Sequence, residues 1–150
     1  MREAACLCSQ VHRWVEGKTG YRFSCTALKS RMVAATPPRH PYLNAFLVNE
    51  EFIYWEDVHL GIANDLDDYL IAPVIHSVQE KNPEQIVTTR GDLLEHGRDK
   101  RLVPSEMSDS SFANSNMDKF GIESLTANIN LPESVILMVG RIPDTYIRIE

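Results

Sequence analysis

The run from Ser134 to Ile142 is almost wholly apolar, which is expected of a β-strand that is covered on both faces. A sheet with such a strand needs a second layer, so the chain is predicted to fold around a layered core. Residues 145–149 alternate and are predicted to be the hairpin partner of this strand. Further strands are predicted over 4–15, 46–54, 58–63 and 69–75, with 46–54 and 58–63 joined as a hairpin through Trp55-Glu56-Asp57.

Proline and capping residues place the other elements. Pro73 has no amide hydrogen, so the strand over 69–75 must lie at an edge or carry a bulge. Asn82 can cap a helix that starts at Pro83, with Gln85 completing a capping box and Gly97 as the stop. The apolar face of this helix consists of Ile86, Val87, Leu93 and Leu94.

An earlier helix is predicted to follow a cap at Thr19 and to end before Thr36-Pro37-Pro38, because residues before proline avoid the helical region. Its apolar stripe consists of Tyr21, Phe23, Leu28 and Met32. Antiparallel hairpins with interspersed helices indicate a mixed α/β chain of the α+β type, not a regular βαβ alternation. A doubly wound nucleotide-binding fold is disfavoured, and the sequence contains no glycine-rich phosphate loop.

Size and charge limit the classes of function. A chain of 150 residues fits one domain, taken here as residues 1–150. The net charge of -6, without a basic run, argues against a nucleic-acid partner. No segment approaches the roughly 20 apolar residues that cross a bilayer, so no membrane association is expected. The three cysteines, with Cys6 and Cys8 two residues apart, are predicted to be reduced, in a cytoplasmic setting.

Two segments carry a recognisable pattern. Residues 10–17, Gln-Val-His-Arg-Trp-Val-Glu-Gly, are similar to the signature His-x-x-x-Asp-Gly, with His12 as its histidine and Glu16 in place of the aspartate. Residues 110–117, Ser-Ser-Phe-Ala-Asn-Ser-Asn-Met, are similar to Gly-Thr-Phe-Thr-Ile-Ser-Asn-Leu, with Ser115 as the serine. Ala113, Asn114 and Asp118 depart from the threonine, isoleucine and glycine of that pattern.

Three further stretches extend the likeness. Residues 131–142 are similar to Pro-Pro-Glu-Val-Ala-Ile-Leu-Gly-Val-Gly-Arg-Ile, and residues 40–45 and 61–75 match two more stretches in the same order. On these segments the chain resembles the catalytic domain of the 2-oxo acid dehydrogenase acyltransferases (dihydrolipoamide acyltransferases) and chloramphenicol acetyltransferase. The resemblance implies the chloramphenicol acetyltransferase-like fold, with two layers and a mixed, largely antiparallel sheet.

The order of the segments differs from that family. In the family the histidine signature follows the Gly-Arg-Ile strand, whereas here His12 precedes Gly140-Arg141-Ile142. The resemblance therefore implies a circularly permuted domain, opened at an exposed hairpin, and shortened by the family's opening segment. No lipoyl domain or subunit-binding domain is expected within the sequence.

The resemblance also implies a mechanism. His12 is the general base that activates a thiol or hydroxyl acceptor, because imidazole has a pKa near neutrality. Ser115 donates a hydrogen bond to the oxyanion formed from a thioester such as acyl-CoA, an interaction worth about 2.7–4 kcal/mol. Glu16 belongs to the same catalytic site, where it holds the turn, and Arg13 and Asn116 are assigned to substrate binding. No tightly bound cofactor is implied, only acyl-CoA or another thioester as co-substrate.

The family builds its site between subunits, so a homotrimer acting on a small acyl donor and acceptor is implied. The alternative is a non-catalytic trimeric scaffold or binding module that retains the fold. No metal site is expected: the other four histidines lack ligand spacing, and the aspartates at 65, 67 and 68 lack the glycine and distal glutamate of a calcium loop.

Overall fold

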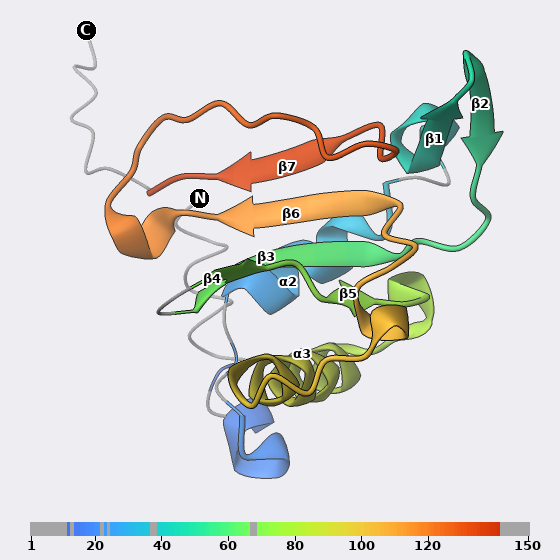
Figure 1. The fold of residues 1–150 in the computed structure, drawn as a ribbon. Helices are drawn as coiled ribbons and strands as arrows, with labels where there is room; N and C mark the ends of the chain where they lie inside the picture. Colours follow the sequence, from blue (N-terminus) through green and yellow to red (C-terminus); the bar gives the residue numbers. More distant parts are fainter. Residues whose placement is uncertain are drawn as a thin grey trace, which may run out of the picture.

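The computed structural model describes residues 12, 14–21, 23, 25–36, 39–66 and 69–141. Its centre is a five-stranded sheet in the order β4-β3-β6-β7, with β5 also paired to β3 (Figure 1). The strands are β3 (Leu60–Leu66), β4 (Tyr69–Ile71), β5 (Val74–Ile75), β6 (Phe112–Asn116) and β7 (Ile136–Val139).

Strand directions in this sheet are mixed. β6 runs parallel to both β3 and β7, whereas β4 and β5 pair antiparallel with β3. Together with a separate antiparallel hairpin, three of the five pairings among the described residues are antiparallel. The predicted α/β fold with a mixed sheet is confirmed.

Two helices, α2 (Cys25–Val33) and α3 (Pro83–Arg98), lie on one side of the sheet (Figure 1). Apolar side chains from both layers fill the space between them, and burying each large one contributes roughly 1.5–3 kcal/mol. The buried cluster consists of Val15, Phe23, Ala27, Ala34, Val58, Leu60, Ile62, Ile75, Val78, Ile86, Val87, Leu93 and Phe112.

The start of α3 is as predicted. Asn82 Oδ1 accepts a hydrogen bond from the Gln85 amide at 2.9 Å, and Gln85 Oε1 accepts one from the Asn82 amide at 2.9 Å. The helix runs to Arg98, one residue past the predicted stop at Gly97. A Cβ at Gly97 would lie 2.5 Å from Ile71 Cδ1, so this glycine lets α3 pack closely on β4.

The earlier helix is confirmed as α2, although its details differ from the prediction. Thr19 does not cap it, because its hydroxyl donates to the Val15 carbonyl at 2.9 Å in the preceding helical segment. Phe23 is buried and Leu28 half-buried, but Met32 is 63% exposed and does not belong to the apolar stripe.

The first predicted strand is wrong where it can be compared. Residues 12 and 14–19 are helical, while residues 4–11 lie outside the described residues, as does the predicted strand over 145–149. Val15 is fully buried, and Lys18 Nζ lies 3.2 Å from Glu84 Oε1 of α3. These long-range contacts override the β-propensity of the local residues.

The predicted hairpin across residues 55–57 is also wrong. The hairpin observed joins β1 (Ala45–Val48) to β2 (Glu51–Tyr54), and β3 belongs to the main sheet. Asn49 and Glu50 turn the chain with φ values of 52° and 65°, the left-handed pair found in tight hairpins. The glycine that usually marks such a turn is missing, so the residues of this turn do not predict a hairpin.

A buried network joins this hairpin to the sheet. Asn44 ends the 3-10 helix η2 (Pro41–Asn44), and its Nδ2 donates to the carbonyls of Trp55 and Asp57 at 2.8 and 2.9 Å. Ser111 Oγ donates to Asn44 Oδ1 at 2.6 Å and accepts from the His59 amide at 2.9 Å. We call Asn44, Ser111 and their partners the Asn44 network.

The break predicted at Pro73 is confirmed. β4 and β5 are separated there, and the Pro73 carbonyl accepts from the Ile62 amide at 3.0 Å. Among the described residues, no helix is long and apolar enough to cross a bilayer. The remaining short 3-10 helices are η3 (Val78–Glu80), η4 (Pro104–Glu106) and η5 (Asp118–Phe120).

Candidate active site

Ser115 lies inside the sheet, on β6 between β3 and β7. It is paired in register with Ala63 and Met138, and it is only 9% exposed. Successive side chains of a strand point to opposite faces. Its neighbour Asn116 contacts α2, so Ser115 points to the face of the sheet away from the helices.

Small side chains surround Ser115 on that face. Gly61, Ala63 and Ala113 share it, according to the register of β3 and β6. Within the described part of the chain, the hydroxyl of Ser115 forms no hydrogen bond, so no described residue competes with an oxygen of a bound molecule for its proton.

Asn116, predicted to bind substrate, is committed elsewhere. Its Nδ2 donates to Thr26 Oγ1 of α2 at 3.1 Å, and its Oδ1 accepts from the Asp118 amide at 3.1 Å. The structure places it on the helix-covered face, not beside the Ser115 hydroxyl. In this arrangement Asn116 ties the end of β6 to α2.

His12 stands in a helical segment and not at a strand end, which corrects its predicted setting. Its Nδ1 lies 3.0 Å from the Phe23 carbonyl, and its Nε2 lies 3.1 Å from Glu16 Oε2. Both partners are oxygen atoms that accept hydrogen bonds, so these contacts hold the imidazole ring within its own helical segment and next to Phe23.

Glu16 pairs with His12, and among the described residues no other ion pair of Glu16 is found. Arg13 lies outside the described residues. No contact joins His12 to Ser115 among the described residues, and the prediction that subunits bring them together stays a prediction. The same holds for the assignment of these residues to catalysis.

Two titratable groups near the sheet were missed by the sequence reading. Glu133 is 5% exposed, and its Oε1 lies 3.8 Å from the position that a Cβ would take on Gly61. Burial raises the pKa of Glu133, and a hydrogen bond from Ser110 opposes this shift. Burial and the neighbouring His76 lower the pKa of His59, whose ring centroid lies 4.9 Å from that of His76. The burial of Glu133 and His59 could not be recognised without the fold, although Glu133 lies in the segment 131–142 that resembles the family.

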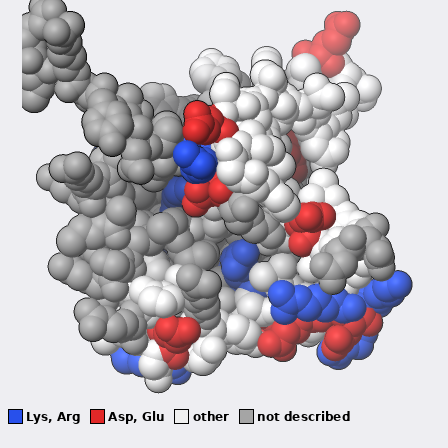
Figure 2. Space-filling view, turned by 90° about the vertical axis from the view of Figure 1, so that its left-hand side faces the viewer, with Lys and Arg blue, Asp and Glu red and all other residues white. Residues whose placement is uncertain are grey.

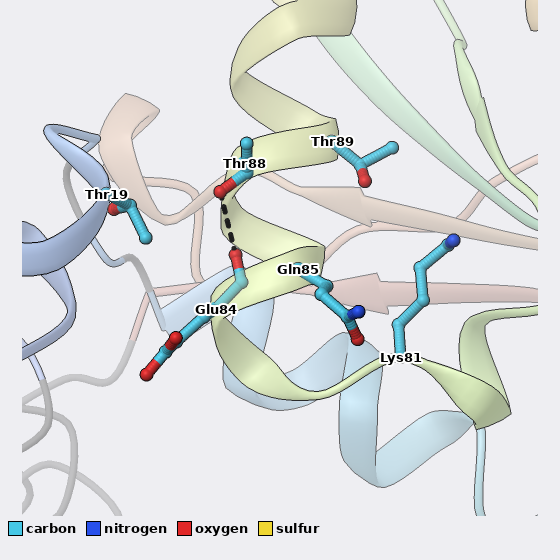
Figure 3. A pocket seen from close by; sticks show the side chains of 6 residues that line it. All are labelled: Thr19, Lys81, Glu84, Gln85, Thr88 and Thr89. Atoms are coloured by element: carbon cyan, nitrogen blue, oxygen red, sulfur yellow. Dashed lines mark hydrogen bonds between the residues drawn. The ribbon is translucent and has the colours of Figure 1, made fainter.

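An open pocket of about 370 Å³ lies along the first half of α3, where its lining is polar (Figure 3). The pocket is lined by Thr19, Lys81, Glu84, Gln85, Thr88 and Thr89. The sheet separates this pocket from the Ser115 face, which α3 does not cover.

Two other searches give no second candidate site. Figure 2 shows a face on which basic and acidic side chains lie side by side. Within the described residues, no group of three or more His, Cys, Asp or Glu side chains could hold a metal ion.

Comparison with known families decides the classification. The family described as 2-oxoacid dehydrogenases acyltransferase (catalytic domain) matches residues 7–149. The chain belongs to this acyltransferase family. The resemblance carried by the serine segment and the Gly-Arg-Ile segment is thereby confirmed.

Individual relatives agree with the acyltransferase family. The chain is 31% identical, over 141 residues and 94% of its length, to the dihydrolipoyllysine-residue acetyltransferase component of the acetoin cleaving system of Bacillus subtilis. Its fold is similar to a probable dihydrolipoamide acetyltransferase of Listeria monocytogenes, with a TM-score of 0.91, 24% identity and 98% of this chain covered. The dihydrolipoamide acetyltransferase of Azotobacter vinelandii gives a TM-score of 0.87 at 28% identity over 93% of this chain.

The chain spans 35% of the length of the Bacillus protein, 63% of the Listeria chain and 58% of the Azotobacter chain. The match over residues 7–149 is continuous, whereas a permuted domain would match in two pieces of exchanged order. The hypothesis of a circular permutation is therefore not supported. In an unpermuted acyltransferase domain, residues 10–17 cannot correspond to a signature that follows Gly-Arg-Ile.

Proposed function

We propose that this chain forms the part of an acyltransferase active site that stabilises the oxyanion, in a reaction that moves an acyl group from a thioester to a thiol or hydroxyl. The observation that carries the proposal is the Ser115 hydroxyl. It lies in the segment that resembles the family's serine segment, and it forms no hydrogen bond with a described residue. The family match does not favour the alternative of a non-catalytic scaffold.

The chemistry follows from the position of that hydroxyl. Attack on a thioester carbonyl forms a C–O or C–S bond and places a negative charge on the carbonyl oxygen. Ser115 is fixed on a central strand, so it can donate to that oxygen without first reorganising. When the tetrahedral species collapses, the thiolate leaves and takes up the proton lost by the acceptor. Acyl-CoA is the thioester that we propose as the co-substrate.

We propose that the base is an imidazole and that its source is not His12. The Azotobacter enzyme has been studied for the roles of a serine, a histidine and an asparagine in its catalytic mechanism, and its serine precedes its histidine in the chain. In this sequence all five histidines precede Ser115. We propose that the imidazole comes from a segment that follows Gly140-Arg141-Ile142 in the family order, on the same or another polypeptide.

Assembly is part of the proposal. One similar structure, at 28% identity and a TM-score of 0.82, is the cubic core of the pyruvate dehydrogenase multienzyme complex. We propose a homotrimer because that relative forms a core of many subunits. The cytoplasmic location stays a prediction.

Thiol release from acetyl-CoA, with dihydrolipoamide as acceptor, tests the proposal. Free imidazole is added to supply the base, and turnover is expected to depend on it. Ser115→Ala should lower the rate roughly 100- to 1000-fold, and Ser124→Ala, at an exposed loop position, should leave it unchanged. His12→Ala should also leave it unchanged.

Two outcomes would contradict parts of the proposal. Turnover without imidazole that disappears in His12→Ala would restore His12 as the base. No turnover with any acyl thioester, with or without imidazole, would overturn the assignment as an enzyme.

A further inference from the structure

The segment 130–133 holds the β1–β2 hairpin against the main sheet. The Leu47 amide of β1 donates to the Pro132 carbonyl at 3.2 Å, and Phe46 forms an antiparallel bridge with Glu133. β7 begins shortly after Glu133, and the hairpin lies beside this end of the sheet (Figure 1). The hairpin is thus attached to the sheet here as well as through the Asn44 network.

The side chain of Glu133 extends this junction to the centre of the sheet. Ser110 Oγ accepts from the Gly61 amide of β3 at 3.0 Å, and its hydroxyl donates to the Glu133 carboxyl. Glu133 Oε1 lies 3.8 Å from the position that a Cβ would take on Gly61, on the face that carries Ser115. The family pattern has glycine where Ser110 stands, so the bond from Ser110 is a property of this chain.

The surroundings of Glu133 suit a carboxyl group without charge. Its side chain is 5% exposed, and its Oε2 has no hydrogen-bond partner in the described part of the chain. A buried carboxylate with so few donors loses hydration that nothing replaces, whereas a protonated carboxyl loses far less. Burial therefore raises the pKa of Glu133, against the smaller effect of the hydrogen bond from Ser110.

Neighbouring charges do not offset this cost. The elements around Glu133 and the residues next to them carry the titratable side chains Tyr42, Glu51, Tyr54, His59, Asp65 and Asp109. Burial and Ser110 are the causes of the pKa shift, and none of these described side chains contributes to it. The protonation of Glu133 is therefore coupled to the closure of the junction around it.

We propose that Glu133 is a pH-sensitive latch, which holds β1 against the main sheet while its carboxyl is protonated and releases β1 when it ionises. The proton goes to solvent, and the carboxylate leaves the junction to regain its hydration. This movement breaks the contact with Ser110 and weakens the bond from the Leu47 amide, while the Asn44 network keeps the hairpin attached. It also uncovers part of the face that carries Ser115. The latch does not depend on whether the chain transfers acyl groups.

Hydrogen exchange at single amides tests the latch. An acid whose pKa is higher in the closed state favours closure at low pH, and this contribution is lost as pH rises from about 4.3 through the pKa of the closed state. Protection of the Leu47 amide, corrected for the intrinsic pH dependence of exchange, should fall roughly tenfold from about pH 5 to about pH 8. Protection of the Trp55 amide, which donates to the Asn44 carbonyl at 3.0 Å, should stay constant. Constant protection at Leu47 would overturn the latch, and so would an equal fall at Trp55, because the whole hairpin would then be leaving.

Three variants assign the opening to Glu133. Glu133→Gln keeps the shape of the side chain and does not titrate, so its protection at Leu47 should not change with pH. Glu51→Gln, the same substitution at an exposed position of the hairpin, should follow wild type. Ser110→Gly, the family's residue, removes the hydrogen bond that favours the carboxylate, so the fall in protection should move to higher pH. A fall of wild-type size in Glu133→Gln, or an unshifted fall in Ser110→Gly, would overturn the proposal.

Discussion

Two asparagines in the interior, Asn44 and Asn114, have the same burial but opposite surroundings. They are 2% and 1% exposed. Every polar atom of the Asn44 side chain has a partner, whereas neither polar atom of Asn114 has one in the described part of the chain. Burial of a polar group therefore says little about its contribution to stability, because the sign depends on whether its hydrogen bonds are made.

The largest change in the free energy of unfolding is expected from breaking the Asn44 network, in which every polar side-chain atom of Asn44 has a partner. Asn44→Leu leaves the carbonyls of Trp55 and Asp57 and the hydroxyl of Ser111 without their partner. Each buried group left this way costs about 1–3 kcal/mol, so the free energy of unfolding should fall by roughly 3–5 kcal/mol. Urea unfolding measures it.

Ser111→Ala is the matched control, since it removes one bond to Asn44 and one from the His59 amide. Its loss should be smaller than that of Asn44→Leu. A loss below about 1 kcal/mol for Asn44→Leu would show that the Asn44 network does not hold the hairpin to the sheet.

Replacing Asn114 is expected to change the free energy of unfolding in the opposite direction. Asn114→Ile removes two unpartnered buried atoms and adds apolar surface to the core. The free energy of unfolding should rise by about 1–3 kcal/mol, less any cost of fitting the larger side chain. Urea unfolding under the same conditions as for Asn44→Leu tests the contrast.

Asn116→Ala serves as the control for this position, because Asn116 is on the same strand face and has partners. It should lower stability instead of raising it. If Asn114→Ile destabilises the protein as much as Asn116→Ala, the contrast between asparagines with and without hydrogen-bond partners fails.

A third asparagine, at the exposed start of α3, should give a smaller loss. Asn82→Ala removes the side-chain acceptor for the Gln85 amide, and water can replace part of that bond. The expected loss is about 1 kcal/mol, read from the urea midpoint at unchanged slope. Asn82→Ser keeps a hydrogen-bond acceptor and should recover most of the lost stability. A loss in Asn82→Ala as large as that in Asn44→Leu would contradict the role of burial.

The same contrast explains what the sequence could predict. The start of α3 is encoded by four consecutive residues, so its capping box was predicted correctly. The position of Ser115 followed from a long segment that resembles the family. Its pairing with Ala63 joins residues far apart in the chain, and no local pattern reports that register.

His12 shows the limit of a short motif. The segment 10–17 is similar to a signature of six residues, yet residues 12 and 14–19 are helical, and the chain follows the family order. Its setting depends on the Phe23 carbonyl and on the contact of Lys18 with Glu84. The long match over residues 7–149 carries information that the short one does not, because it includes order and spacing.

The smallest effect expected is the pH dependence of stability that arises from His59, whose amide belongs to the Asn44 network. His59 Nδ1 accepts from the Ser77 amide at 3.1 Å, and a protonated ring cannot accept. Burial and His76 lower the pKa of His59 below 6.5, against the opposing charges of Asp57 and Asp109. The unfolded chain therefore binds a proton more readily than the folded one. The contribution is fully present above about pH 6.5 and is lost as pH falls through the lower pKa of the folded state.

One hydrogen bond at a partly exposed ring is involved, so the loss should stay below about 1 kcal/mol. Urea midpoints from about pH 8 to about pH 5 measure it in wild type and in His59→Asn, whose Oδ1 can accept without titrating. The variant should show a flatter profile, while His40→Asn, at an exposed position, should follow wild type. Asn114→Ile should also keep the wild-type profile, because an asparagine side chain does not titrate in this range. A flattened profile in Asn114→Ile would mean that the two asparagine sites are coupled across the core and cannot be treated as independent.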